Sequence, residues 1–306
     1  MRHDLADGHS LGATIYMGQS GMDNFFSWIW IVFLILALQP LLTERIRAMR
    51  RANAIRAVER SQGTRVITMI HRQERRSLLG FPVSRFINLE DAQTIIAAIK
   101  QTPTDRPIDF IVHTPGGLVL AAMQIARAIE AHPAKVRVMV PVYAMSGGTL
   151  IALAADEIVM DEFSVLGPID PQLAGFPAAS IVRARDSKPI SEVHDLTLVM
   201  ADMAEKALAQ VKRGAIELTH KRLGEERAAV LAEKLAGGQW THDYALTFAE
   251  AASLGLPVKS GLPPEVLQLM TLYPQPVQSS GVEFLPIDPS GGRGRPQSFP
   301  APGTVR

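Results

Sequence analysis

The strongest constraint on the fold is a regular alternation of short apolar runs with helix-like stretches, which begins at residue 64. Four runs have the length and apolar character of strands, at residues 65–71, 107–114, 136–144 and 157–162. Stretches typical of helices separate them, at residues 89–101, 118–132 and 146–155. This order predicts an α/β fold whose parallel strands are joined by right-handed crossovers.

The chain beyond residue 162 carries weaker signals. We expect a long helix over residues 191–223 and a short final helix near Phe248–Leu254, after a loop with Gly237 and Gly238. From residue 273 to 306 the composition changes, since this stretch holds seven of the chain's 21 prolines and few large aliphatic residues. Such a segment cannot bury enough surface to offset its ordering entropy, so we predict that it is disordered.

An uncharged apolar run of 18 residues, 25–42, precedes the α/β region. As a helix rising about 1.5 Å per residue it would be about 27 Å long, close to the hydrocarbon core of a bilayer. One arginine and three aspartates stand before the run, whereas six arginines follow it within residues 45–60. A cleaved signal peptide has the opposite charge order. We therefore predict a single-pass transmembrane helix in the cell inner membrane, with the main domain in the cytoplasm by the positive-inside rule.

Residues 43–62 connect this run to the α/β region and have helical spacing, with arginines on most faces. Two interpretations are open, an amphipathic helix lying on anionic headgroups and a solvated connector helix. Gly63 is expected to end this helix. The predicted organisation is a short N-terminal segment (1–24), a transmembrane helix (25–42), a basic connector (43–62), the main domain (63–272) and a disordered tail (273–306).

The composition excludes several classes of function. Lys and Arg number 31 against 30 Asp and Glu, so the chain lacks the basic excess of a nucleic-acid-binding protein. The absence of cysteine excludes disulfides, a thiol nucleophile and Cys-rich zinc sites. No glycine-rich phosphate-binding motif is present, and the eight histidines include no His-x₃-His pair. We therefore expect no nucleic-acid partner, no cofactor and no metal.

Two glycine-containing junctions follow neighbouring predicted strands. Residues 113–117 (HTPGG) end one strand and residues 144–148 (AMSGG) end the next. Both would lie at the carboxyl ends of parallel strands, where ligands bind in open α/β sheets. Ser146 would stand at the positive end of a helix, and unshielded glycine amides from the two junctions would form an oxyanion hole. Taken alone, either junction is more typical of an ordinary helix cap or turn than of a catalytic site.

Together these junctions resemble the Clp protease/crotonase superfamily. Residues 166–172 (LGPIDPQ) and 250–256 (EAASLGL) extend the match to about residues 64–260. Within the superfamily, the chain is similar to the membrane-anchored signal peptide peptidase A-like serine proteases, and specifically to the serine dehydrogenase proteinase group. The resemblance implies a Clp protease/crotonase-like fold with a parallel ββα-type core and assembly into a homo-oligomer. One departure is His113-Thr114, which stands where relatives commonly have Asn-Ser and alters the pocket wall.

The resemblance also implies roles for individual residues. Ser146 would be the nucleophile, and the amides of Gly117 and Gly147 would form the oxyanion hole. Clp-type relatives carry their histidine in the segment that matches residues 167–172, where this chain has none. Signal peptide peptidase A-like relatives use a downstream lysine instead, and Lys188, 42 residues after Ser146, matches that spacing.

Several alternatives for the base stay open, beginning with the possibility that Lys188 is a solvated loop residue. The other candidates are Lys206, Lys212, His194 beside Asp195, and His242 beside Asp243. The two lysines are expected to lie along a helix surface, whereas either histidine would complete a Ser-His-Asp triad.

Two main hypotheses for function follow. The first is a membrane-anchored serine endopeptidase that cleaves a peptide or protein substrate through a Ser-Lys dyad and a backbone oxyanion hole, with the lipid bilayer and further copies of the chain as partners. The second is a non-proteolytic, crotonase-like scaffold or assembly partner at the membrane. A third option, an α/β-hydrolase with Ser146 at its nucleophile elbow, requires a histidine on a late loop.

Overall fold

The structure is a computed structural model that describes residues 13–71 and 86–273, although many side chains between residues 13 and 41 are outside that description. The chain divides into two units, Met1–Asn53 and Ala54–Arg306. All of the predicted tail after Tyr273 lies outside the described residues.

The apolar run 25–42 is helical and belongs to one long helix, α1 (Ala13–Gln62). As predicted, the helix ends before Gly63, which has a positive φ of 67° and donates a hydrogen bond to the carbonyl of Glu59. Among the residues that the structure describes, no helix is long and apolar enough to cross a membrane. Most side chains of the run lie outside the described set, so the membrane anchor stays a prediction.

Five parallel strands form the central sheet, in the order β1–β2–β3–β5–β9. Their bounds are Arg65–Ile70, Ile108–His113, Val136–Val140, Glu157–Met160 and Val258–Ser260. The predicted parallel sheet is thereby confirmed, and β9 adds a strand that the sequence did not indicate. Because side chains alternate along a strand, Phe110 and Val112 of β2 belong to one core cluster and Ile111 to another.

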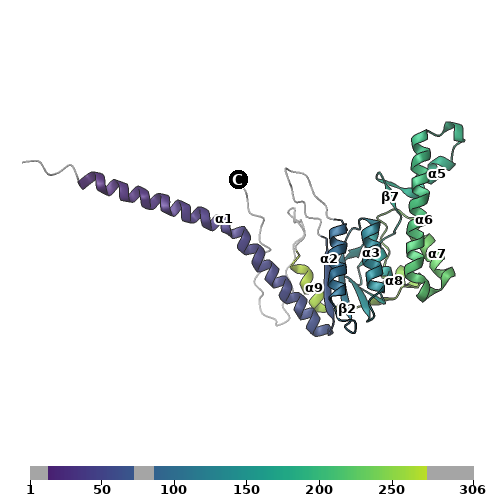
Figure 1. The fold of residues 1–306 in the computed structure, drawn as a ribbon, viewed down its shortest axis with the longest axis horizontal. Helices are drawn as coiled ribbons and strands as arrows, with labels where there is room; N and C mark the ends of the chain where they lie inside the picture. Colours follow the sequence, from purple (N-terminus) through teal and green to yellow (C-terminus); the bar gives the residue numbers. More distant parts are fainter. Residues whose placement is uncertain (1–12, 72–85, 274–306) are drawn as a thin grey trace, which may run out of the picture. The chain divides into compact units, whose positions relative to one another are not determined.

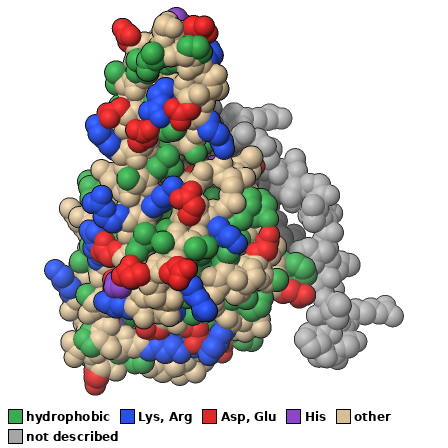
Figure 2. Space-filling view, turned by 90° about the vertical axis from the view of Figure 1, so that its right-hand side faces the viewer, with side chains coloured by type: hydrophobic (Ala, Val, Ile, Leu, Met, Phe, Trp, Pro, Cys, Tyr) green, Lys and Arg blue, Asp and Glu red, His purple; other side chains and the backbone are tan. Residues whose placement is uncertain are grey.

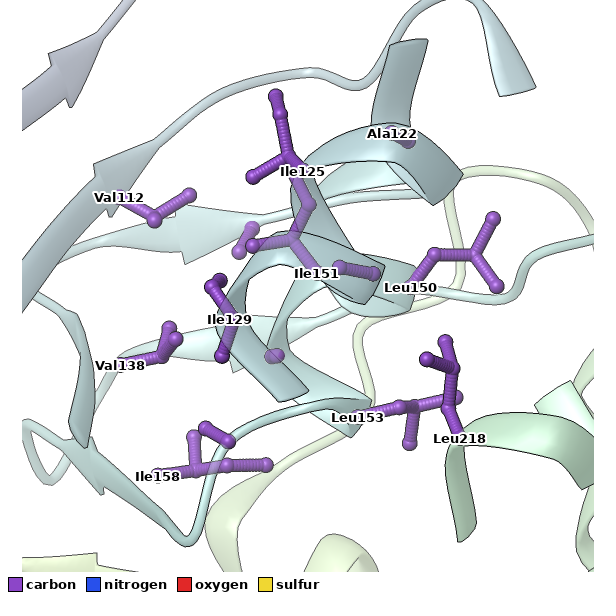
Figure 3. Packing of buried hydrophobic residues seen from close by; sticks show 14 of the residues in the cluster. Val112, Ala122, Ile125, Ile129, Val138, Leu150, Ile151, Leu153, Ile158 and Leu218 are labelled. Carbon is purple, nitrogen blue, oxygen red and sulfur yellow. The ribbon is translucent and has the colours of Figure 1, made fainter. Parts of the chain in front are cut away.

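The larger core cluster lies between the sheet and the helices α2 (Leu89–Lys100), α3 (Val119–Glu130) and α4 (Gly147–Leu153). Figure 3 shows Ile125 and Ile129 of α3 close to Ile151 of α4 and to the strand residue Val138. Each such buried side chain stabilises the fold by about 1.5–3 kcal/mol. The core therefore holds α4, and with it the residue before it, Ser146, rigidly against the sheet.

The smaller cluster covers the opposite face of the sheet. It joins Val58 near the end of α1 to Ile111, Met139 and residues of α9 (Pro264–Thr271). The last turns of the predicted connector therefore pack against the sheet, which neither sequence interpretation anticipated. The first half of the connector does not pack in this way, because Ile46 and Met49 are 50% and 66% exposed.

Helices dominate the region after β5 (Figure 1). The bounds are α5 (Ala178–Asp186), a 3₁₀ turn (Ile190–Glu192), α6 (Asp195–Leu223), α7 (Glu225–Ala236) and α8 (Phe248–Ser253). The long predicted helix starts at Asp195 rather than at residue 191, and α5 and α7 had not been predicted. On the face that carries α5–α7, acidic and basic side chains are interspersed (Figure 2).

The predicted strand 136–144 is divided in two. β3 ends at Val140, and after Pro141, which has no N–H to donate, the chain re-forms a two-residue strand, β4 (Tyr143–Ala144). β4 pairs in parallel with β6 (Val165–Leu166) outside the main sheet. A short hairpin of β7 (Gln172–Leu173) and β8 (Phe176–Pro177) follows. This division matters because β4 leads directly into Ser146.

Candidate active site

The turn after β2 requires glycine at both of its last positions. Gly116 and Gly117 have φ values of 107° and 156°. A Cβ at Gly117 would lie 2.3 Å from both the backbone N and the backbone O of Ile87. This close approach exists because Ile87 N donates to Gly116 O at 2.8 Å, and Ile87 O accepts from Leu118 N at 2.9 Å. The segment before α2 thus fixes the position of the turn.

The turn at Ser146 holds a serine in a strained conformation. Its φ is 50° and its ψ is −113°, a region that costs a non-glycine residue about 1–3 kcal/mol. Among the described residues Ala174 is the other non-glycine with a positive φ, and it sits in the hairpin between β7 and β8. Ser146 precedes α4 but its side chain makes no capping hydrogen bond. The interpretation of Ser146 as an ordinary helix cap therefore does not describe this geometry.

The two turns lie against each other. A Cβ at Gly116 would be 2.7 Å from Ser146 Cβ, and a Cβ at Gly147 would be 3.5 Å from Gly117 N. Backbone hydrogen bonds from Thr114 N to Tyr143 O and from Met145 N to Thr114 O, at 3.2 and 3.0 Å, join the segments that lead into the turns. The structure therefore brings Ser146, Gly117 and Gly147 together.

Two backbone amides at this junction are available to a ligand. Gly147 is the first residue of α4, so its N–H points out of the helix without an intrahelical acceptor. Within residues 13–71 and 86–273, neither the Gly147 amide nor the Gly117 amide donates a hydrogen bond. Two unshielded N–H groups beside a serine hydroxyl can stabilise an oxyanion formed when that hydroxyl attacks a carbonyl.

A buried polar network supports the first turn. Thr114 Oγ1 accepts a hydrogen bond from Gly116 N at 3.2 Å and lies 2.8 Å from His71 Nδ1. The other ring nitrogen of His71 is 3.3 Å from Asp91 Oδ2. Thr114, the position of one departure from the family pattern, therefore links the glycine turn to β1 and α2.

His113, the other departure, is buried next to this network. Burial lowers the pKa of His113 to about 4, with a smaller contribution in the same direction from His71. Its ring lies 4.2 Å, centroid to centroid, from the ring of Tyr143. At neutral pH His113 is therefore an uncharged part of the wall rather than a cation.

The structure does not bring Lys188 to Ser146. Lys188 is exposed and lies between α5 and the 3₁₀ turn, and its side chain contacts no other described residue through a hydrogen bond or ion pair. The other two candidate lysines form ion pairs on helix surfaces, Lys206 with Asp202 and Lys212 with Glu233, each with 2.6 Å between Nζ and a carboxylate oxygen. His194 is exposed at the start of α6, and its side chain forms no cap there.

His242 has a partner that the sequence did not suggest. Its Nδ1 lies 2.8 Å from Oδ1 of Asp170, not beside the adjacent Asp243. Asp170 belongs to the 166–172 motif, and Gln172 Nε2 donates to its other oxygen at 2.6 Å. The motif indicated that this segment was important, but nothing in the sequence indicated a contact across 72 positions.

Comparison with known proteins identifies one matching family and two similar proteins. Residues 16–298 match a sequence model of the ClpP-like SDH-type serine proteinases, a range that includes both turns. An uncharacterized protein of Methanocaldococcus jannaschii is 50% identical over 268 residues, which are 87% of this chain and 93% of the relative. A second uncharacterized protein of the same organism is 47% identical over 269 residues, 88% of this chain and 91% of the relative.

Proposed function

Since the chain belongs to the family of ClpP-like SDH-type serine proteinases, we propose that it is a membrane-anchored serine peptidase with Ser146 as nucleophile. The observation that carries the proposal is the meeting of the strained, non-capping Ser146 with the amides of Gly117 and Gly147. A serine that only capped a helix would gain nothing from this conformation. Strain of this kind is typical of residues whose position serves a reaction.

The reaction follows from these groups. Ser146 Oγ attacks the carbonyl carbon of a peptide bond while a base removes its proton, and the carbonyl oxygen becomes an oxyanion held by the two amides. Collapse of this intermediate releases the amine and leaves an acyl-enzyme, which water then hydrolyses. Each oxyanion-hole donor is worth about 3 kcal/mol in the transition state.

For the base, the resemblance supports Lys188 and hence a Ser-Lys dyad. A lysine acts as a base only while its amine is neutral, which a desolvated site next to the nucleophile favours. In the described structure Lys188 is exposed, and no hydrogen bond joins its amine to Ser146. A dyad therefore requires that the segment between α5 and α6 bring Lys188 to the serine in the active state.

The membrane anchor is supported by side chains of α1. Trp30, Phe33 and Leu36 are 69%, 61% and 59% exposed on this helix, an arrangement suited to lipid rather than to water. The arginines that follow the run support, by the positive-inside rule, a catalytic unit on the cytoplasmic side of the inner membrane. Assembly into a homo-oligomer rests on the resemblance alone.

Replacing the nucleophile tests the proposal directly. Ser146→Ala in the full-length protein should abolish both covalent labelling by a fluorophosphonate probe and cleavage of a quenched-fluorescent peptide library. Ser253→Ala is the matched control, because that serine is exposed and, among the described residues, its hydroxyl bonds only the Glu250 carbonyl. Cleavage that persists in Ser146→Ala, with unchanged melting temperatures in both variants, would refute the proposal and favour the scaffold.

A further inference from the structure

The direction of the Gly117 amide is set by contacts from outside the glycine turn. A peptide group is planar and trans, so the carbonyl of one residue and the N–H of the next point in opposite directions. Gly116 O accepts a hydrogen bond from Ile87 N at 2.8 Å, and this bond fixes the peptide plane to which the Gly117 N–H belongs. The two glycines have no side chains that could hold this plane. The aim of the proposed oxyanion-hole donor therefore depends on what holds its neighbours.

The first contact, from Ile87, is held in place at the start of α2. Ile87 is followed by Asn88, the cap residue of this helix. The backbone N of Asn88 donates to Asp91 Oδ2 at 3.0 Å, and Asp91 N donates to the Asn88 side chain at 2.9 Å. This reciprocal pair is a capping box, which satisfies two backbone donors and fixes the cap residue. The position of Ile87 therefore depends on the Asp91 carboxylate.

The second contact, from Thr114, reaches the same carboxylate by another route. Gly116 N donates to Thr114 Oγ1 at 3.2 Å, and this hydroxyl lies 2.8 Å from His71 Nδ1. The other ring nitrogen of His71 is 3.3 Å from Asp91 Oδ2, the oxygen that also accepts the bond from the cap residue. Because the His71 side chain is only 7% exposed, water competes little for these bonds. Two routes from the glycine turn thus end on one oxygen atom.

The hydrogen bonds of the second route run in one direction. The His71 nitrogen that faces the carboxylate carries the ring proton, which leaves Nδ1 of the neutral ring as an acceptor. The Thr114 hydroxyl therefore donates to Nδ1 and accepts from Gly116 N with a lone pair. Aligned hydrogen bonds polarise one another, so the negative charge of Asp91 strengthens the hold on the turn.

From this convergence we propose that Asp91, acting through His71 and through the cap of α2, is a positioning residue that aims the Gly117 amide at the oxyanion; the inference rests on the proposed function. Asp91 acts on the reaction only through the glycine turn. Its contribution is to keep the donor aligned before charge develops on the carbonyl oxygen, which is the condition under which such a donor is most effective. A carboxylate that only capped α2 would leave the reaction unchanged.

Labelling kinetics of the full-length protein test the assignment, with every variant assayed below its melting temperature. Asp91→Ala should lower the maximal rate of fluorophosphonate labelling by about 10-fold or more, because loss of an oxyanion donor costs about 10²–10³ and misalignment costs part of that. The probe concentration that gives half of the maximal rate should change by less than about twofold, since the amide acts in the transition state rather than in binding. A general distortion of the site would change both quantities.

Asn88→Ala is the matched control, because it removes the other half of the same capping box. In the described part of the chain the Asn88 side chain accepts a hydrogen bond only from Asp91 N, so the variant keeps the carboxylate and the backbone N of residue 88. Loss of a capping side chain destabilises a helix, so the melting temperature should fall in both variants. Labelling of Asn88→Ala should nevertheless stay within about twofold of the wild-type rate. Equal labelling of the two variants, whether normal or slowed, would overturn the inference.

Two substitutions of His71 test the second route. His71→Leu removes both ring nitrogens and should slow labelling by about 10-fold. His71→Asn carries an amide oxygen on Cγ, the carbon to which Nδ1 is attached, so it retains an acceptor for Thr114 and should recover part of the rate. Combining Asp91→Ala with His71→Leu should slow labelling by less than the product of the two single effects, because both changes break the same route.

The remaining outcomes separate this inference from the proposed function. Normal labelling of either Asp91→Ala or His71→Leu would overturn the inference and leave Ser146 as the nucleophile. Multiplicative effects in the double variant, or equal rates for His71→Leu and His71→Asn, would also overturn it, because the hydrogen-bonded route would then carry no effect. Labelling that persists in Ser146→Ala would instead remove the proposed function itself.

Discussion

Gly117→Ala is the substitution whose effect the structure defines most sharply. The new Cβ would stand 2.3 Å from the backbone N and O of Ile87, where real Cβ atoms are not found below 3.0 Å. Ordinary contact starts at 3.4 Å, so the turn must move by about 1 Å. The hydrogen bonds of Ile87 run to Gly116 and Leu118, on either side of Gly117, so the displacement distorts these bonds and shifts the Gly117 amide. Misplacing a reacting group by about 1 Å costs about 100-fold in rate, and losing one oxyanion donor costs about 10²–10³.

The matched control is Gly261→Ala, which shares the backbone strain without the clash. Gly261 has a φ of 97°, and nothing lies within 4 Å of a Cβ placed there. Backbone strain should cost both variants about 1–2 kcal/mol of stability in urea unfolding, because alanine is disfavoured at positive φ. Gly117→Ala should lose more than Gly261→Ala, because of its clash with Ile87. Only Gly117→Ala should also lose about 100-fold or more in fluorophosphonate labelling. Equal labelling of both variants would show that the Gly117 amide does not hold the oxyanion.

Further predictions concern the polar groups beneath the turns. Thr114→Val removes the acceptor for the Gly116 amide and the partner of His71, so we expect a loss of about 1–3 kcal/mol in urea unfolding and slower labelling; unchanged values for both would refute the role of Thr114 as a support. For His113, the folded pKa of about 4 lies below the ordinary 6.5, so the unfolded chain binds the proton first as the pH falls. The free energy of unfolding is therefore unaffected by His113 above pH 6.5 and falls by about 3 kcal/mol as the pH is lowered toward 4. His113→Gln should lack this decrease when unfolding is measured across the same pH range.

The central part of the sheet was predictable because its strands β2, β3 and β5 are buried on both faces. All six residues of β2 are buried, and such strands appear in a sequence as uninterrupted apolar runs. The meeting of Ser146 with the Gly116–Gly117 turn also followed from the sequence, since neighbouring parallel strands end at the same edge. By contrast, β9 has only three residues, none of them buried, and carries no such signal.

The contacts that complete the site were not predictable, because they join segments without a common periodic pattern. Ile87 meets Gly117 through a single bridge, and Leu246 meets Leu166 through another. Asp243, as the neighbour of His242 in the sequence, was the expected partner, but the loop carries the histidine to the buried Asp170 instead. Pro141 was visible in the sequence, yet its effect, the separation of β3 from β4, depends on the presence of β6 as a second partner.

The backbone of Ser146 has an evolutionary consequence. Glycine adopts a φ of 50° without the steric penalty that a Cβ incurs, so selection for thermal robustness alone would favour glycine at this position. Proteins retain such destabilising residues where function requires them, as long as the fold stays above its stability threshold. A serine at residue 146 is therefore better explained by selection for chemistry than by selection for a durable scaffold.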